Sequence, residues 1–179
     1  MAEPRRIEGW VVAVTGARSA DLEATKHDAR EILAGGGFRL LAEREGVVHS
    51  PALGATARES FAAWLDAAGP IDVLINNAGV MHVGPFLEES DEWARRQVDV
   101  NLHGVILGMK LALPAMVERG SGHVVNVASA AAKIGVPREA VYAASKHAVL
   151  GLSESLRGEL RGSGVELSVV MPGLVRTEL

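Results

Sequence analysis

The feature that most constrains this chain is a set of four short apolar runs separated by helical patterns. The runs are Trp10–Thr15, Ile71–Ile75, His123–Ala128 and Val165–Met171, and each is rich in Val, Ile or Leu. Near-continuous apolar runs of this length are typical of parallel strands that are covered on both faces. We therefore expect a parallel sheet built from these four segments.

Helical patterns fill the intervals between the runs. Thr56–Ala68 has a capping residue at its start and ends before Gly69-Pro70, Ser90–Arg119 contains one or two helices, and Val141–Arg161 contains another. Strands that alternate with helices predict a doubly wound α/β sheet with right-handed crossovers. In such sheets ligands bind at the carboxyl ends of the strands, so functional residues are expected just after each run.

Composition excludes several classes of protein. The 179 residues suit a single domain over residues 1–179, and the absence of cysteine excludes disulfides and thiolate chemistry. A net charge of −4 disfavours a nucleic-acid binder, and none of the six histidines has the spacing of a metal motif, so no metal is expected. The apolar stretches are too short or too interrupted to span a bilayer, and the N-terminus lacks a signal peptide's apolar region. We therefore expect no membrane partner and a cytoplasmic location.

Residues suited to holding a ligand follow each run. In Thr15-Gly16 the glycine allows the backbone to approach a pyrophosphate, and the small residues of Asn76-Asn77-Ala78-Gly79 allow a ring or a ribose to pack against the chain. Ser129 can donate to a substrate carbonyl, and Pro172-Gly173 forms a rigid turn that could wall a cofactor site. Each of these residues is also common in ordinary turns or helix caps, so their joint occurrence carries the prediction.

Tyr142 and Lys146 form the most chemically specific pair. They are four residues apart, so on a helix they share one face. A free tyrosine has a pKa of about 10, which is too high for efficient proton transfer at neutral pH. A neighbouring cation lowers that pKa and allows the phenol to exchange a proton with an alcohol or carbonyl oxygen.

Together these motifs resemble those of the short-chain dehydrogenase/reductase family, from about Thr56 to Leu179. Order and spacing agree as well: Asn101 precedes Ser129 by 28 residues, and Ser129 precedes Tyr142 by 13. The resemblance implies a Rossmann fold and an NAD(P)-dependent oxidoreductase that interconverts a small alcohol and a ketone by hydride transfer.

The resemblance also implies a role for each catalytic residue. Tyr142 would be the general acid/base, and Lys146 would lower its pKa and bind the nicotinamide ribose. Ser129 would hold and polarise the substrate oxygen. Asn101 would anchor a water molecule that links Lys146 to solvent.

The cofactor would be held by residues at several strand ends. Asn77 and Gly79 would line the adenine-ribose side, and the segment from Pro172 to Thr177 the nicotinamide side. The cofactor is NAD or NADP in this family: an acid at the end of the second strand favours NAD, which we expect, whereas Arg18 would favour the 2′-phosphate of NADP. The full set of expected cofactor-binding residues is Thr15, Gly16, Arg18, Asn77, Ala78, Gly79, Tyr142, Lys146, Pro172, Gly173, Val175 and Thr177.

The phosphate loop departs from the family pattern. The family motif TGxxxGxG is replaced by Thr15-Gly16-Ala17-Arg18-Ser19-Ala20-Asp21-Leu22, which lacks both later glycines. Asp21 places a negative charge near the expected pyrophosphate, and the repulsion would cost on the order of 1 kcal/mol or more. The alternative to an enzyme is therefore a cofactor-impaired relative that acts as a binding or scaffold protein. A serine hydrolase is disfavoured because Ser129 does not lie in a GxSxG elbow.

The stretch before Val47-Val48 is also too short for two crossovers, so one crossover is expected to be missing. Either residues are absent between Ser19 and Ala20, which we favour and which would make Asp21 the ribose-binding acid, or the chain is continuous. In the continuous case Leu22–Ala34 forms the first helix, Phe38–Ala42 the second strand, and Glu43 is the acid.

Two further expectations concern substrate and partners. Family members generally continue beyond the equivalent of Leu179 into a substrate-covering segment, which we expect this chain to lack. The segment Ala130–Ala140 is largely small or apolar, although it contains Lys133 and Arg138. The helical stretches around His103–Glu118 and Val141–Arg161 pair between subunits in the family, so a homodimer or homotetramer is expected.

Overall fold

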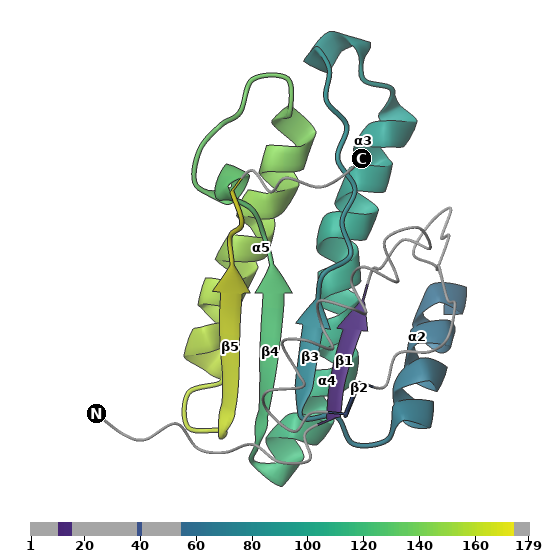
Figure 1. The fold of residues 1–179 in the computed structure, drawn as a ribbon, viewed down its shortest axis with the longest axis vertical. Helices are drawn as coiled ribbons and strands as arrows, with labels where there is room; N and C mark the ends of the chain where they lie inside the picture. Colours follow the sequence, from purple (N-terminus) through teal and green to yellow (C-terminus); the bar gives the residue numbers. More distant parts are fainter. Residues whose placement is uncertain (1–10, 16–38, 41–54, 174–179) are drawn as a thin grey trace.

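A computed structural model of the chain describes residues 11–15, 39–40 and 55–173 (Figure 1). All the described strands are parallel, and they lie in the order β2-β1-β3-β4-β5. The strands are β1 (Val11–Thr15), β2 (Arg39–Leu40), β3 (Val73–Asn76), β4 (Gly122–Val127) and β5 (Val165–Val170). The predicted parallel sheet and its four predicted strands are therefore confirmed.

The helices also lie where their patterns predict them. They are α2 (Ala55–Ala68), α3 (Asp91–Val98), α4 (Gly104–Arg119) and α5 (Ala140–Glu159). The stretch predicted to hold one or two helices contains α3 and α4, joined by a π-helical turn at Asp99–His103. Short 3-10 turns lie at Phe86–Glu88 and Ala130–Ala132. Because π turns inside helices often mark functional sites, this junction is a place to look for one.

The second strand agrees with a continuous chain. β2 pairs in parallel with β1, Val11 opposite Arg39 and Val12 opposite Leu40, and it falls inside the predicted segment Phe38–Ala42. The favoured alternative placed the second strand in residues missing after Ser19, and the pairing of β2 beside β1 speaks against it. The Ser19–Ala20 junction itself, the predicted helix Leu22–Ala34 and Val47-Val48 lie outside the described residues.

The described core lies between the sheet and the helices α4 and α5. Leu74 of β3, Val124 of β4 and Val149 of α5 are completely buried. Phe61 and Leu65 of α2 pack against the same core, which brings α2 onto the face that α4 covers. Burial is nearly continuous along β3, whereas in β5 the buried Val165 and Leu167 alternate with the exposed Glu166.

One long helical stretch corrects an expectation from the sequence. Asp91–Arg119 is long and apolar enough to cross a membrane by length and composition alone, with a mean hydropathy of 1.5. In the fold its α4 part packs on the sheet through Val105, Met109 and Met116, which are all buried. The histidine and charges that interrupt the stretch lie on other faces of the helix, so the apolar face serves the core.

The carboxyl ends of the strands meet at one edge of the sheet. Thr15 of β1 is paired with Asn76 of β3, at the point where the strand order reverses direction. Beyond β4 the chain stays beside the segment after β5, because Ala130 N donates to Pro172 O at 2.8 Å. This edge therefore gathers the segments that carry the predicted site residues.

Candidate active site

Lys146 lies buried in the first half of α5, with its charged end directed at the end of β4. Its side chain is only 4% exposed, and Nζ donates a hydrogen bond to Val127 O at 3.0 Å. The same Nζ lies 5.8 Å from the centre of the Tyr142 ring, within the range of a cation–π contact. The predicted neighbourhood of the two side chains on one helix face is thus present.

Burial has a clear electrostatic consequence for Lys146. Desolvation lowers the pKa of its ammonium group from the ordinary 10.5 to about 8. Among the described residues, the ammonium has one hydrogen-bond acceptor although it carries three donors. A charged group held in this way can stabilise negative charge that develops beside it, as on a phenolate oxygen.

Asn101 lies in the π-helical turn and is completely buried. Its side-chain Oδ1 accepts from Val80 N at 2.8 Å, and its Nδ2 donates to Val80 O at 2.9 Å. Nδ2 also donates to Ser145 Oγ at 3.0 Å, on α5. The amide therefore joins the segment after β3 to the helix that carries Tyr142 and Lys146.

Gly79 lies at the same place, beside the Lys146 ammonium. A Cβ atom at Gly79 would be 3.5 Å from Lys146 Nζ and 3.6 Å from Asn101 Oδ1. Gly79 is exposed, so the absence of a side chain leaves the surface above the ammonium open. The resemblance assigned Gly79 to the adenine-ribose side, whereas its position in the fold is beside the lysine expected to bind the nicotinamide ribose.

Ser129 follows β4 and is half-buried at the start of the turn Ala130–Ala132. Its Oγ accepts from Ala131 N at 3.2 Å, so the helix-cap use considered for this serine is present. A hydroxyl can accept two bonds and donate one, and the cap uses only an acceptor position. The proton of Ser129 is therefore still available to a substrate oxygen.

Several predicted residues cannot be placed. The backbone of Thr15 ends β1 at the expected edge, but Gly16, Arg18, Asp21, Val175 and Thr177 lie outside the described residues. The remaining predicted residues lie at or near the carboxyl edge of the sheet: Asn77, Ala78, Gly79, Asn101, Ser129, Tyr142, Lys146, Pro172 and Gly173.

A second buried polar cluster escaped prediction. Asn76 Nδ2 donates to Asn126 Oδ1 at 2.8 Å, and Asn126 Nδ2 donates to Ser153 Oγ at 2.9 Å. Asn76 therefore points into the core, unlike its neighbour Asn77, which is partly exposed. The signal that could have revealed this cluster is the polar residue Asn126, which interrupts the apolar run HVVNVA.

The chain is similar to known proteins over most of its length. The model of the short chain dehydrogenase family matches residues 7–179. Dehydrogenase/reductase SDR family member 7B of Mus musculus is 33% identical over 189 residues, which cover 94% of this chain and 58% of that protein. The ketoacyl reductase HetN of Nostoc sp. is 46% identical over 110 residues, which cover 62% of this chain and 38% of that protein.

Solved structures share the fold. LigO from Sphingobium sp. strain SYK-6, in its apo form, superposes with a TM-score of 0.73 at 29% identity, covering 95% of this chain and 70% of LigO. A metagenomic short-chain oxidoreductase in complex with NADP gives 0.69 at 33% identity, covering 94% of this chain and 72% of that one.

The relatives are longer than this chain. It spans 35% of the rat member 7B and 46% of an uncharacterised oxidoreductase from Staphylococcus saprophyticus. The family match, by contrast, includes nearly every residue, and the parallel sheet agrees with the fold shared with the solved structures. This chain belongs to the short-chain dehydrogenase family.

Proposed function

We propose that the chain is an NAD(P)-dependent oxidoreductase that interconverts a small alcohol and a ketone. The observation that carries this proposal is the buried Lys146 ammonium, which is bonded to Val127 O at the end of β4 and lies beside the Tyr142 ring. Burying a cation costs free energy, and a chain that retains one next to a phenol has a use for the charge.

In the reductive direction, the Ser129 hydroxyl donates a hydrogen bond to the carbonyl oxygen of the substrate and holds that oxygen in place, while its proton stays on the serine. Tyr142 transfers its phenolic proton to the same oxygen as that oxygen becomes an alkoxide. Lys146 stabilises the phenolate that Tyr142 becomes, which eases the transfer. In the oxidative direction the Tyr142 phenolate takes the proton back from the alcohol.

The exposed Gly79 and the unshared donors of Lys146 fit the nicotinamide end of a dinucleotide, which would supply the hydride. Asn77, Ala78, Pro172 and Gly173 would contribute further contacts along the same edge. NAD is the preferred cofactor in this proposal, because Glu43 follows the second strand at Arg39–Leu40 and would bind the adenosine ribose hydroxyls.

The test is a reductase assay on a panel of small ketones with NADH and with NADPH. Wild-type turnover is expected with NADH, and Tyr142→Phe is expected to lower kcat by about 10³-fold because the proton donor is lost. Undiminished turnover by Tyr142→Phe would refute the proton-transfer role.

A second function is favoured by one specific observation. The sequence lacks two glycines of the family's phosphate loop and has Asp21 there, so the chain could be a cofactor-impaired binding or scaffold protein. Titration of cofactor fluorescence separates the two proposals. Saturable micromolar binding supports the enzyme, and no binding up to millimolar cofactor supports the scaffold.

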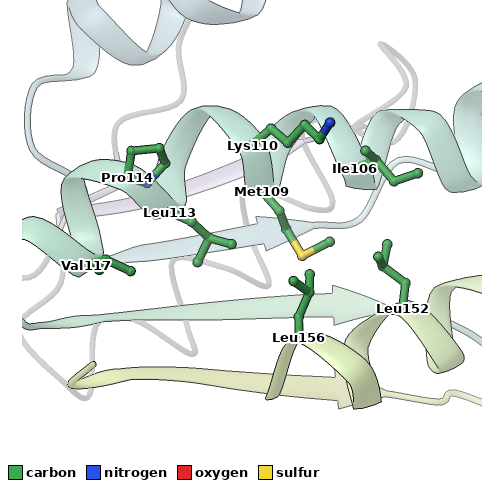
Figure 2. Close-up of a pocket in the computed structure, with 8 residues that line it drawn as sticks. All are labelled: Ile106, Met109, Lys110, Leu113, Pro114, Val117, Leu152 and Leu156. Atoms are coloured by element: carbon green, nitrogen blue, oxygen red, sulfur yellow. The ribbon is translucent and has the colours of Figure 1, made fainter. Parts of the chain in front are cut away.

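We also propose that the chain forms a homodimer through α4 and α5. Figure 2 shows a groove between these helices whose lining is apolar except for Lys110, and the partner would be a second copy of the same face. Its lining residues are Ile106, Met109, Lys110, Leu113, Pro114, Val117, Leu152 and Leu156. Val117→Glu should yield a monomer in sedimentation velocity, whereas Leu87→Glu, at an exposed leucine of the turn before α3, should not. A wild-type monomer would refute this dimer.

A further inference from the structure

Gln97 is a polar side chain that the chemistry proposed above does not use. It lies near the end of α3, four residues before Asn101, and it is completely buried. Its Oε1 accepts from His82 N at 3.0 Å, and its Nε2 donates to the carboxylate of Glu89. A buried amide is costly unless both of its ends are bonded, and here the segment after β3 satisfies both ends.

The segment that Gln97 binds is the loop Val80–Glu89. Asn101 binds its first residue, Val80, through both N and O. Because Gln97 and Asn101 are four residues apart in a helical stretch, their amides face the same side and bind the loop at successive points. His82 also stacks on Trp93 of α3, with ring centres 5.6 Å apart.

This loop lies beside both segments that carry the catalytic residues. It begins next to Gly79, which is beside Lys146 Nζ. Further along, Gly84 N donates to Arg138 O at 2.9 Å, four residues before Tyr142. Figure 1 shows that this loop and the loop before α5 both rise beyond the carboxyl ends of the strands. The loop therefore lies at the same end of the sheet as the segments that carry Ser129 and Tyr142.

We propose that Gln97 is a positioning residue: together with Asn101 it clamps the loop Val80–Glu89 into a fixed wall on the substrate side of the active site. The proposal rests on the proposed reductase function for its kinetic consequence. Met81 and Val83, which are 50% and 52% exposed, lie on the clamped loop and are available to contact an apolar part of the substrate. Fixing them before binding removes the entropic cost of ordering the loop with each substrate molecule.

Exchanging the amide of Gln97 with the carboxylate of Glu89 tests whether their hydrogen bond holds the loop. Gln97→Leu removes both bonds, and Gln97→Glu places a second carboxylate against Glu89, where neither can donate. Glu89→Gln alone should be tolerated because its amide oxygen still accepts from Gln97. The double variant Gln97→Glu, Glu89→Gln should restore the clamp, because the new amide at position 89 can donate to the new carboxylate at position 97. The other oxygen of that carboxylate then accepts from His82 N.

The expected kinetic result is an effect on the ketone substrate without an effect on the cofactor. Gln97→Leu and Gln97→Glu should raise KM for the ketone about tenfold, the equivalent of one hydrogen bond to a charged group, without weakening cofactor binding. If Gln97 had a merely structural role, its loss would reduce the fraction of active enzyme and would change the kinetics with the ketone and with the cofactor alike. Failure of the double variant to recover the KM of the wild type would overturn the proposal.

Amide hydrogen exchange tests the clamp without turnover. In Gln97→Leu the His82 amide should exchange about tenfold faster, while the Val80 amide stays protected by Asn101. Unchanged protection at His82 would overturn the clamp, whatever the activity. Faster exchange at His82 in a protein that reduces no ketone would refute the proposed function and leave the clamp supported.

Discussion

Two buried Asn–Ser pairs lie two turns apart on α5, and their local chemistry is nearly the same. Asn101 Nδ2 donates to Ser145 Oγ at 3.0 Å, and Asn126 Nδ2 donates to Ser153 Oγ at 2.9 Å. In each pair the serine hydroxyl donates in turn to a backbone carbonyl of α5. The hydrogen bonds alone therefore do not distinguish a functional pair from a structural one.

The surroundings make the difference. The Asn126 pair is enclosed between sheet and helices, where its other neighbours are Asn76 and the sulfur of Met109. The Asn101 pair lies at the carboxyl edge, next to the Lys146 ammonium and the exposed Gly79. A closed uncharged pair can only stabilise the fold, whereas a pair beside a buried charge with an open surface can also position chemistry.

The largest expected effect is at the charge itself. Lys146→Met should lower kcat/KM by about 10³-fold, since proton transfer loses its electrostatic support. It should also raise the free energy of unfolding at pH 7 by about 2 kcal/mol, because the desolvation cost disappears while the bond to Val127 O is lost. Urea unfolding and steady-state kinetics measure the two effects, with Lys133→Met on an exposed loop as the control.

The gain in the free energy of unfolding that Lys146→Met should bring depends on pH, and its direction follows from the pKa. The pKa of Lys146 is about 8 in the folded protein and 10.5 ordinarily, so the folded protein binds fewer protons between these values. The desolvated ammonium destabilises the folded protein fully below pH 8, and this destabilisation disappears as the pH rises toward 10.5. The stability advantage of Lys146→Met should therefore shrink between pH 7 and pH 10. A constant difference would contradict the destabilised ammonium.

The next effect concerns Asn76, which is bonded to the enclosed Asn126–Ser153 pair. Gly108 of α4 lies so close to β3 that a Cβ atom would be 2.5 Å from Asn76 Oδ1. Gly108→Ala should therefore lower the free energy of unfolding by about 2 kcal/mol. Gly104→Ala is the matched control on the same helix, because its Cβ would meet Asp99 O at 3.8 Å without strain. Equal thermal stability of the two variants would show that α4 has room to shift.

The smallest effects compare the two serines directly. Ser153→Ala and Ser145→Ala should each lower the free energy of unfolding by about 1 kcal/mol, because an asparagine amide loses an acceptor. Only Ser145→Ala should also lower kcat/KM, by about tenfold, because Asn101 then holds its loop less firmly. Equal kinetic effects of the two variants would abolish the distinction between the pairs.

Much of the fold could be predicted from local pattern. The strands β1, β3, β4 and β5 and the helices α2 and α5 were expected nearly at their observed bounds, because short apolar runs and helical periodicity are local properties. The pairing of Tyr142 with Lys146 was also local, since residues four apart share a helix face.

The sequence by itself thus determined the order of strands and helices along the chain, the family, and those predicted site residues that the structure describes at the carboxyl edge. Only the tertiary structure decided that Lys146 is buried against Val127, that Asn76 turns into the core while Asn77 does not, and that Gln97 clamps a distant loop. The physical reason is that these contacts join groups far apart in the chain, such as Asn76 and Asn126, which are separated by 50 residues. Their burial and partners depend on how helices and sheet pack, which no local pattern specifies.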